Sequence, residues 1–92
     1  MLHHETNLTR AEFARFKKEY NRKDLEFQDL IQGDLVLSRD NTFSEIYSYL
    51  VLEKAFRISG GVSCKVLIRN GHVVPSRCFY KCHRHYFVIL RR

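Results

Sequence analysis

The chain has 92 residues and a formal net charge of +6, with 16 Lys and Arg against ten Asp and Glu. A hydrophobic fraction of 45%, with seven Phe and five Tyr, excludes a disordered tail and predicts one domain over residues 1–92. No apolar run reaches the roughly 18 residues of a membrane span and no signal peptide is visible, so we expect a cytoplasmic protein with no membrane partner. Its three cysteines are then expected to be reduced.

The charges are unevenly distributed along the chain. The first 53 residues contain all ten carboxylates, whereas residues 54–92 contain none and carry nine Lys and Arg. Such a cationic segment either repels itself in water or is completed by something anionic. The anion can be external, or it can come from acidic residues of the first part, such as Asp24, Glu26, Asp29 and Asp34.

The first predicted element is a helix at about residues 9–22. Thr9 and Glu12 form a capping box at its start. Phe13, Phe16 and Tyr20 then recur at helical spacing, which predicts an aromatic face packed on the rest of the protein. Its outer face is cationic, with Arg10, Arg15, Lys17, Lys18 and Arg22.

A connector at residues 23–33 follows, with apolar anchors at Leu25, Phe27, Leu30 and Ile31. Gly33-Asp34 is a turn signal, and residues 35–37 are predicted to be a short strand. Residues 43–58 fit either a helix or a strand. We favour one long strand, because the segment is rich in β-branched and aromatic residues and runs into Gly60-Gly61, a hairpin signal.

The remaining segment predicts short strands joined by tight turns. A strand at residues 62–69 ends at Asn70-Gly71, a pair typical of a type I′ hairpin turn. Pro75 is expected to interrupt the return strand, and residues 79–82 and 86–90 are predicted to be two further strands. Such closely spaced strands indicate a small barrel over residues 34–91.

The turn at Gly33-Asp34, the two hairpins and the step Val73-Val74-Pro75-Ser76 resemble the layout of SH3-like barrels. This resemblance implies an α+β fold, with the N-terminal amphipathic helix packed on a small, mainly antiparallel, five-stranded SH3-like barrel. It does not imply binding of Pro-rich peptides, because the chain has no Trp. Since SH3-like barrels host many functions, function must be inferred from the site.

The most informative candidate site is a basic and aromatic C-terminal strip. Nucleic-acid surfaces combine cations for phosphates with flat rings for bases, and both alternate in residues 77–87. We therefore predict a small binding protein that contacts DNA or RNA. Its predicted site residues are Lys65, Arg69, Arg77, Tyr80, Lys81, Arg84, Tyr86, Arg91 and Arg92.

Three other interpretations remain open. The same cations can dock on an acidic surface of a larger complex. Cys78, Cys82, His83 and His85 are potential zinc ligands, with Cys64 or His72 as a further candidate. Because Cys78 and Cys82 would lie about 13 Å apart on a strand, buried thiols and no cofactor are favoured. The run from Gly33 to Val36 also resembles the first strand of some small toxin ribonucleases with an SH3-like core. A metal-independent ribonuclease is therefore the one enzymatic interpretation, although we expect no enzyme.

Overall fold

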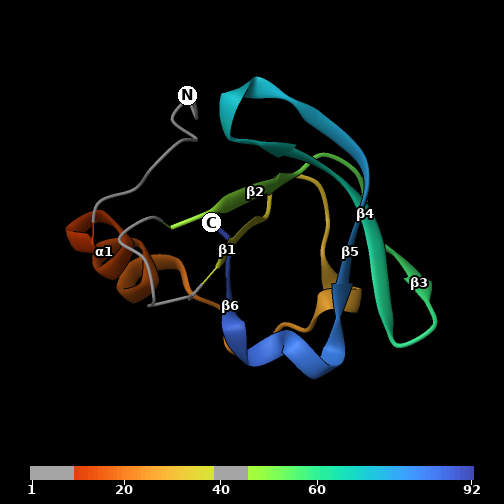
Figure 1. The fold of residues 1–92 in the computed structure, drawn as a ribbon. Helices are drawn as coiled ribbons and strands as arrows, with labels where there is room; N and C mark the ends of the chain where they lie inside the picture. Colours follow the sequence, from red (N-terminus) through yellow and green to blue (C-terminus); the bar gives the residue numbers. More distant parts are fainter. Residues whose placement is uncertain (1–9, 39–45) are drawn as a thin grey trace.

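The computed structural model describes residues 10–38 and 46–92, which form one helix and a six-stranded antiparallel sheet (Figure 1). In chain order the elements are α1 (Arg10–Tyr20), the 3-10 turn η2 (Phe27–Asp29), β1 (Leu35–Ser38), β2 (Ser48–Val51), β3 (Phe56–Ile58), β4 (Gly61–Ile68), η3 (Arg69–Gly71), β5 (Val73–Tyr80), η4 (Lys81–Tyr86) and β6 (Phe87–Leu90). No helix in these ranges is long and apolar enough to cross a membrane.

The helix α1 packs its aromatic face on the sheet, as the sequence predicts. Phe13, Phe16 and Tyr20 lie against a buried cluster of Leu37, Ile46, Val88 and Leu90. The end of the helix is tied to β6, because Arg91 N–H donates to the Tyr20 carbonyl (3.1 Å) and Arg22 N–H donates to the Ile89 carbonyl (2.9 Å). The predicted capping residue Thr9 lies outside the described residues.

The sheet has β4 at its centre. One edge of β4 pairs with β5, and the other edge pairs first with β3 and then with β2. Beyond β2 the order continues through β1 to β6. No pairing joins β5 to β6 in the described part of the chain, because η4 carries the backbone between them. The sheet is therefore not closed, and it has six strands where the prediction had a five-stranded barrel.

The segment predicted as one long strand at residues 43–58 is two short strands in its described part. β2 ends at Val51 and β3 begins at Phe56, and residues 52–55 carry the chain from one end of β4 to the other. This break is stabilised by backbone bonds to distant segments: Leu52 N–H donates to the Lys65 carbonyl (2.8 Å) and Ala55 N–H to the Leu30 carbonyl (3.1 Å). A strand rather than a helix is thus confirmed, but a single continuous strand is wrong.

Both predicted hairpin turns are confirmed. Gly60 has a φ of 80° between β3 and β4. Asn70 and Gly71 have φ values of 76° and 75° between β4 and β5, and two consecutive positive φ angles are typical of a type I′ turn.

Two strand boundaries in the last third differ from the prediction. Pro75 does not interrupt its strand, since β5 runs through it opposite a register shift between Cys64 and Val66. An edge strand tolerates the missing N–H of proline at such a bulge. Cys82 and Tyr86, predicted at strand ends, lie in η4.

The connector covers the main core of the sheet. Leu25, Phe27 and Leu30 are buried as predicted, whereas Ile31 is exposed. The Phe27 ring lies 5.2 Å from the Phe79 ring and 5.7 Å from the Phe87 ring, measured between centroids. The buried anchors therefore hold the acidic connector against β5 and β6, beside the cationic half of the chain.

Candidate nucleic-acid interface

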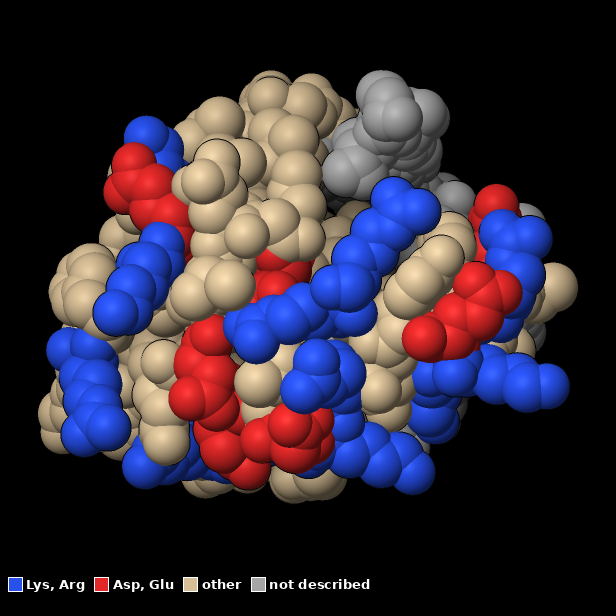
Figure 2. All heavy atoms as spheres, turned by 180° about the vertical axis from the view of Figure 1, so that it is seen from behind, with Lys and Arg blue, Asp and Glu red and all other residues tan. Residues whose placement is uncertain are grey.

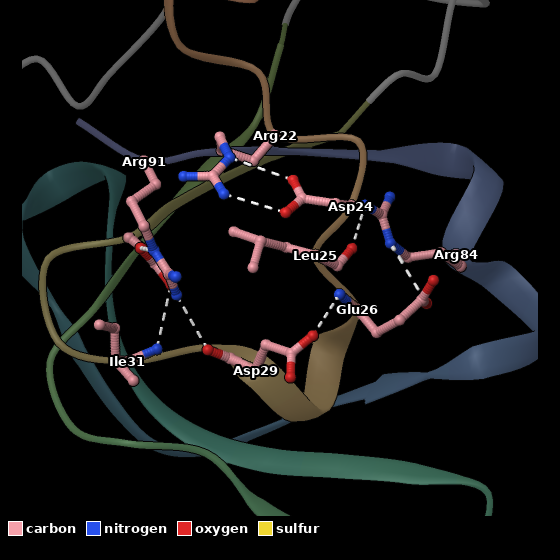
Figure 3. Close-up of polar contacts among 9 residues, drawn as sticks. Arg22, Asp24, Leu25, Glu26, Asp29, Ile31, Arg84 and Arg91 are labelled. Atoms are coloured by element: carbon pink, nitrogen blue, oxygen red, sulfur yellow. Dashed lines mark hydrogen bonds and ion pairs between the residues drawn. The ribbon is translucent and has the colours of Figure 1, made fainter.

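Asp34, which directly follows the connector, neutralises part of the cationic half through an ion pair with Arg91. Figure 3 shows the Arg91 side chain reaching Asp29 of the connector. Arg91 Nε and Nη2 each donate to an Asp34 carboxylate oxygen at 2.8 Å, and Nη2 also donates to the Asp29 carbonyl at 2.9 Å. The Asp34 side chain is 2% exposed and the Arg91 side chain 24%. Hydrogen bonding to Asp34 raises the pKa of Arg91. Arg91, a predicted phosphate ligand, therefore uses its donors inside the protein.

Arg84 is held by the same connector. Its Nη1 donates to the Phe87 carbonyl and its Nη2 to the Leu25 carbonyl, both at 2.9 Å. The guanidinium lies 5.5 Å from the centre of the Phe27 ring, and its Nε lies 3.9 Å from a Glu26 carboxylate oxygen. These contacts join η4 to the connector, so Arg84 has a structural role whatever else it binds.

Arg77 and Lys65 also have internal partners. The Arg77 guanidinium lies 4.8 Å from the ring centres of both Tyr49 and Phe79, and Nη1 donates to the Cys78 carbonyl. Lys65 Nζ lies 3.5 Å from a Glu53 carboxylate oxygen.

The remaining predicted residues are dispersed over several elements. Arg92 lies over the Tyr20 ring at 5.8 Å. Tyr80 is an exposed residue at the end of β5, and a hydrogen bond with Cys78 raises its pKa. Arg69 lies in η3, at the far end of β5 from η4, and its side chain is outside the described part. Among the site residues whose side chains the structure describes, Lys81 is the one cation without an ion pair or ring contact.

The surface charge is consequently mixed. Figure 2 shows Asp and Glu side chains in the middle of one face, with Lys and Arg side chains around them. Ion pairs join Arg22 to Asp24 (2.9 Å), Arg84 to Glu26 and Arg91 to Asp34. The suggestion that acidic residues of the first part neutralise cations of residues 54–92 is thus confirmed for Glu26 and Asp34. Asp24 pairs instead with Arg22 of the same part, and the Asp29 carboxylate accepts from the Glu26 N–H. The excess positive charge must be sought where lysines form no ion pair with a described carboxylate.

One such place is a groove between the end of α1 and η4, which we call the η4 groove. It has a volume of about 530 Å³. Its cationic and polar lining comes from Lys17 in the last turn of α1, Asn21 directly after the helix, Lys23 in the following turn, and Lys81, Arg84 and His85 in η4. Glu26, Phe87 and Val88 complete the lining. Lys17, Lys23 and Lys81 make no ion pair with any described residue.

The strand β6 brings these two parts together. It follows η4 directly, and its far end is hydrogen-bonded to Tyr20 and Arg22 at the end of α1. Lysines separated by more than 50 residues therefore line one groove. The sequence indicated a cationic helix face and a cationic C-terminal strip as separate features, but nothing in it shows that the two meet. Lys23 was not among the predicted site residues.

Tyr86 supplies an exposed ring next to the groove. Its side chain is 51% exposed, and its ring lies 4.1 Å from that of His85, with an angle of 37° between the planes. The His83 ring is 6.0 Å away on the same turn. Aromatic side chains exposed beside cations are suited to stacking on bases.

The thiols and histidines do not form a metal centre in the described ranges. No group of three His, Cys, Asp or Glu residues there could hold an ion. Cys64 is buried among core residues, and burial raises the pKa of its thiol to about 11. The cysteines of the zinc interpretation are thus separated into the core, β5 and η4.

In comparisons with protein-family models, curated proteins and solved structures, no match to this chain was found.

Proposed function

We propose that the protein binds nucleic acid through the η4 groove, with Lys17, Lys23 and Lys81 contacting phosphates and Tyr86 stacking on a base. The observation that carries this proposal is the convergence of three lysines, none paired with a described carboxylate, from two distant segments on one groove. Phosphates attract such lysines because binding releases the counterions condensed on the nucleic acid.

The neighbouring acidic residues are engaged by arginines, which limits their repulsion of a phosphate in the groove. Glu26 lines the groove but faces Arg84 Nε at 3.9 Å, and Asp24 is held by two hydrogen bonds from Arg22. The hydrogen bonds from Arg22 lower the pKa of Asp24, so it stays ionised and paired. The lysines of the groove therefore face carboxylates whose charge is already partly balanced.

We also propose that the sheet is an open variant of an SH3-like barrel. The supporting observations are the order β6-β1-β2-β4-β5 and the short η4 turn that links the two outer strands. A cytoplasmic location is proposed with it, since Cys64, Cys78 and Cys82 are free thiols and thiols persist in reducing compartments.

The direct test is binding of fluorescently labelled DNA and RNA oligonucleotides, followed by anisotropy at low salt. We expect Lys81→Gln to weaken binding roughly fivefold. One exposed charge contact contributes about 1 kcal/mol of binding free energy, and its loss changes the affinity by that factor. Arg57→Gln is the matched control, because Arg57 is an exposed cation on β3 that does not line the groove. Equal effects of both variants would show a general charge effect and contradict the proposed site.

Absence of binding to any oligonucleotide would refute the function itself. A pull-down with and without nuclease then examines the alternative ligand, an acidic protein surface. Partners that survive nuclease and are lost in Lys81→Gln would assign the groove to protein binding.

A further inference from the structure

A row of aliphatic side chains crosses the face of the sheet opposite the main core. Cα register pairs Leu90 with Leu35, Leu35 with Leu50, Leu50 with Leu67, and Leu67 with Val73. Paired residues on neighbouring antiparallel strands project to the same side, so these five form one continuous row over β6, β1, β2, β4 and β5. At about 4.8 Å per strand, it extends roughly 19 Å along the sheet.

The helix α1 covers only the β6 end of this row. Leu90 is buried beneath Phe16 and Tyr20. Farther along, Leu67 is half-buried and Val73 is 48% exposed. The row therefore continues beyond the helix as an apolar surface.

A pocket of about 360 Å³ lies where the helix stops covering the row. Phe16 and Tyr20 form its helical wall, and Leu35, Leu50 and Leu90 form its floor. This volume is in the range of small-molecule sites, which are mostly apolar and carry a few polar groups that orient the ligand.

Arg92 is the charged residue of this pocket. Its guanidinium lies 5.8 Å from the centre of the Tyr20 ring, at the β6 end of the row. No carboxylate of residues 10–38 or 46–92 forms an ion pair with it. One end of the site is thus cationic, and the remainder is aliphatic.

We propose that this pocket binds an amphipathic carboxylate of the fatty-acid class. The carboxylate contacts Arg92, and the alkyl chain lies over Leu35 and Leu50 toward Leu67. The pocket shares no lining residue with the η4 groove, so this binding site is independent of the proposed nucleic-acid function.

The test compares decanoate with decanol, both below their aggregation limits, by NMR of the Leu and Val methyl groups of the full chain. We expect saturable shifts at Leu35, Leu50 and Leu90, and decanoate binding roughly threefold to fivefold tighter than decanol, as one exposed ion pair supplies. Arg92→Gln should abolish this preference while leaving decanol binding unchanged. Lys54→Gln, which removes an exposed charge outside the pocket, should leave the preference intact.

Three results would overturn the proposal. They are the absence of saturable shifts with decanoate, equal affinity for acid and alcohol in the wild type, and shifts confined to other methyl groups. A dispersed amide spectrum throughout each titration separates binding from unfolding by the ligand. Leu67→Thr tests the contact of the alkyl chain, because it removes apolar surface from the row at a half-buried position. It should weaken the binding of decanoate and of decanol equally.

Discussion

Removing Arg91 should destabilise the fold because it leaves the Asp34 carboxylate buried without its counterion. Asp34 is 2% exposed and accepts two hydrogen bonds from Arg91. After Arg91→Met, the Ile31 N–H (3.0 Å) is the one hydrogen-bond donor to its carboxylate left among residues 10–38 and 46–92. Loss of one member of a buried pair costs about 3–5 kcal/mol. Part of this is desolvation of the orphaned charge, which a neutral side chain at position 34 would not suffer.

The orphaned Asp34 charge also determines whether a second substitution raises or lowers stability. Asp34→Asn added to Arg91→Met removes the orphaned charge and keeps the bond from Ile31, so the double variant should be more stable than Arg91→Met by about 1–2 kcal/mol. Urea unfolding of the wild type, Arg91→Met and the double variant measures both effects. Arg22→Met is the control, because the Arg22–Asp24 pair is exposed and its loss should cost much less stability than the loss of Arg91. A double variant less stable than Arg91→Met would refute the account of Asp34.

Three further outcomes follow from local geometry. Gly61→Ala should destabilise the fold by about 3 kcal/mol or more, since the added Cβ would lie 2.1 Å from the Phe79 backbone oxygen. Thermal unfolding measures this cost, with Ser59→Ala as the control variant. A cost similar to that of the control would contradict the close packing at Gly61. Burial raises the pKa of Cys64 from 9.0 to about 11, so the protonated thiol favours the folded state. The free energy of unfolding of the wild type should therefore fall by about 2–3 kcal/mol more than that of Cys64→Ala between pH 9 and 11. If the unfolding free energies of the two proteins changed equally with pH, the raised pKa of Cys64 would be excluded. In native protein, iodoacetamide should modify the exposed Cys82 much faster than the buried Cys64, as peptide mass analysis would show, and equal rates would contradict that burial.

The elements that local chemistry determines were predictable from sequence. The aromatic spacing of α1 depends only on residues within one helix, and the turn at Asn70-Gly71 needs only two residues that accept a positive φ. The break between β2 and β3 was not predictable in this way, because it depends on backbone bonds to Leu30 and Lys65. The open sheet likewise depends on how η4 spans the gap between the outer strands.

The candidate site was predictable as a composition but not as a surface. The sequence shows that Arg84 and Arg91 are cationic, but it does not show that Leu25 and Asp34, more than 50 residues away, occupy their donors. The meeting of Lys17 with Lys81 is equally non-local, since it results from the attachment of α1 to β6. The number of cations in the sequence therefore exceeds the number available to an anion at the surface. The lysines that the end of α1 and the following turn contribute to the η4 groove were not among the predicted site residues.

The most direct test of the central claim is the salt dependence of oligonucleotide binding by the wild type and by a Lys17→Gln, Lys23→Gln, Lys81→Gln triple variant. Three phosphate contacts predict a slope of log affinity against log salt of about −2 to −3, which is a loss of roughly 20- to 60-fold between 50 and 200 mM salt. The triple variant should bind weakly and with a slope near zero. A wild-type slope near zero, or a triple variant that keeps the wild-type slope, would contradict binding through the η4 groove.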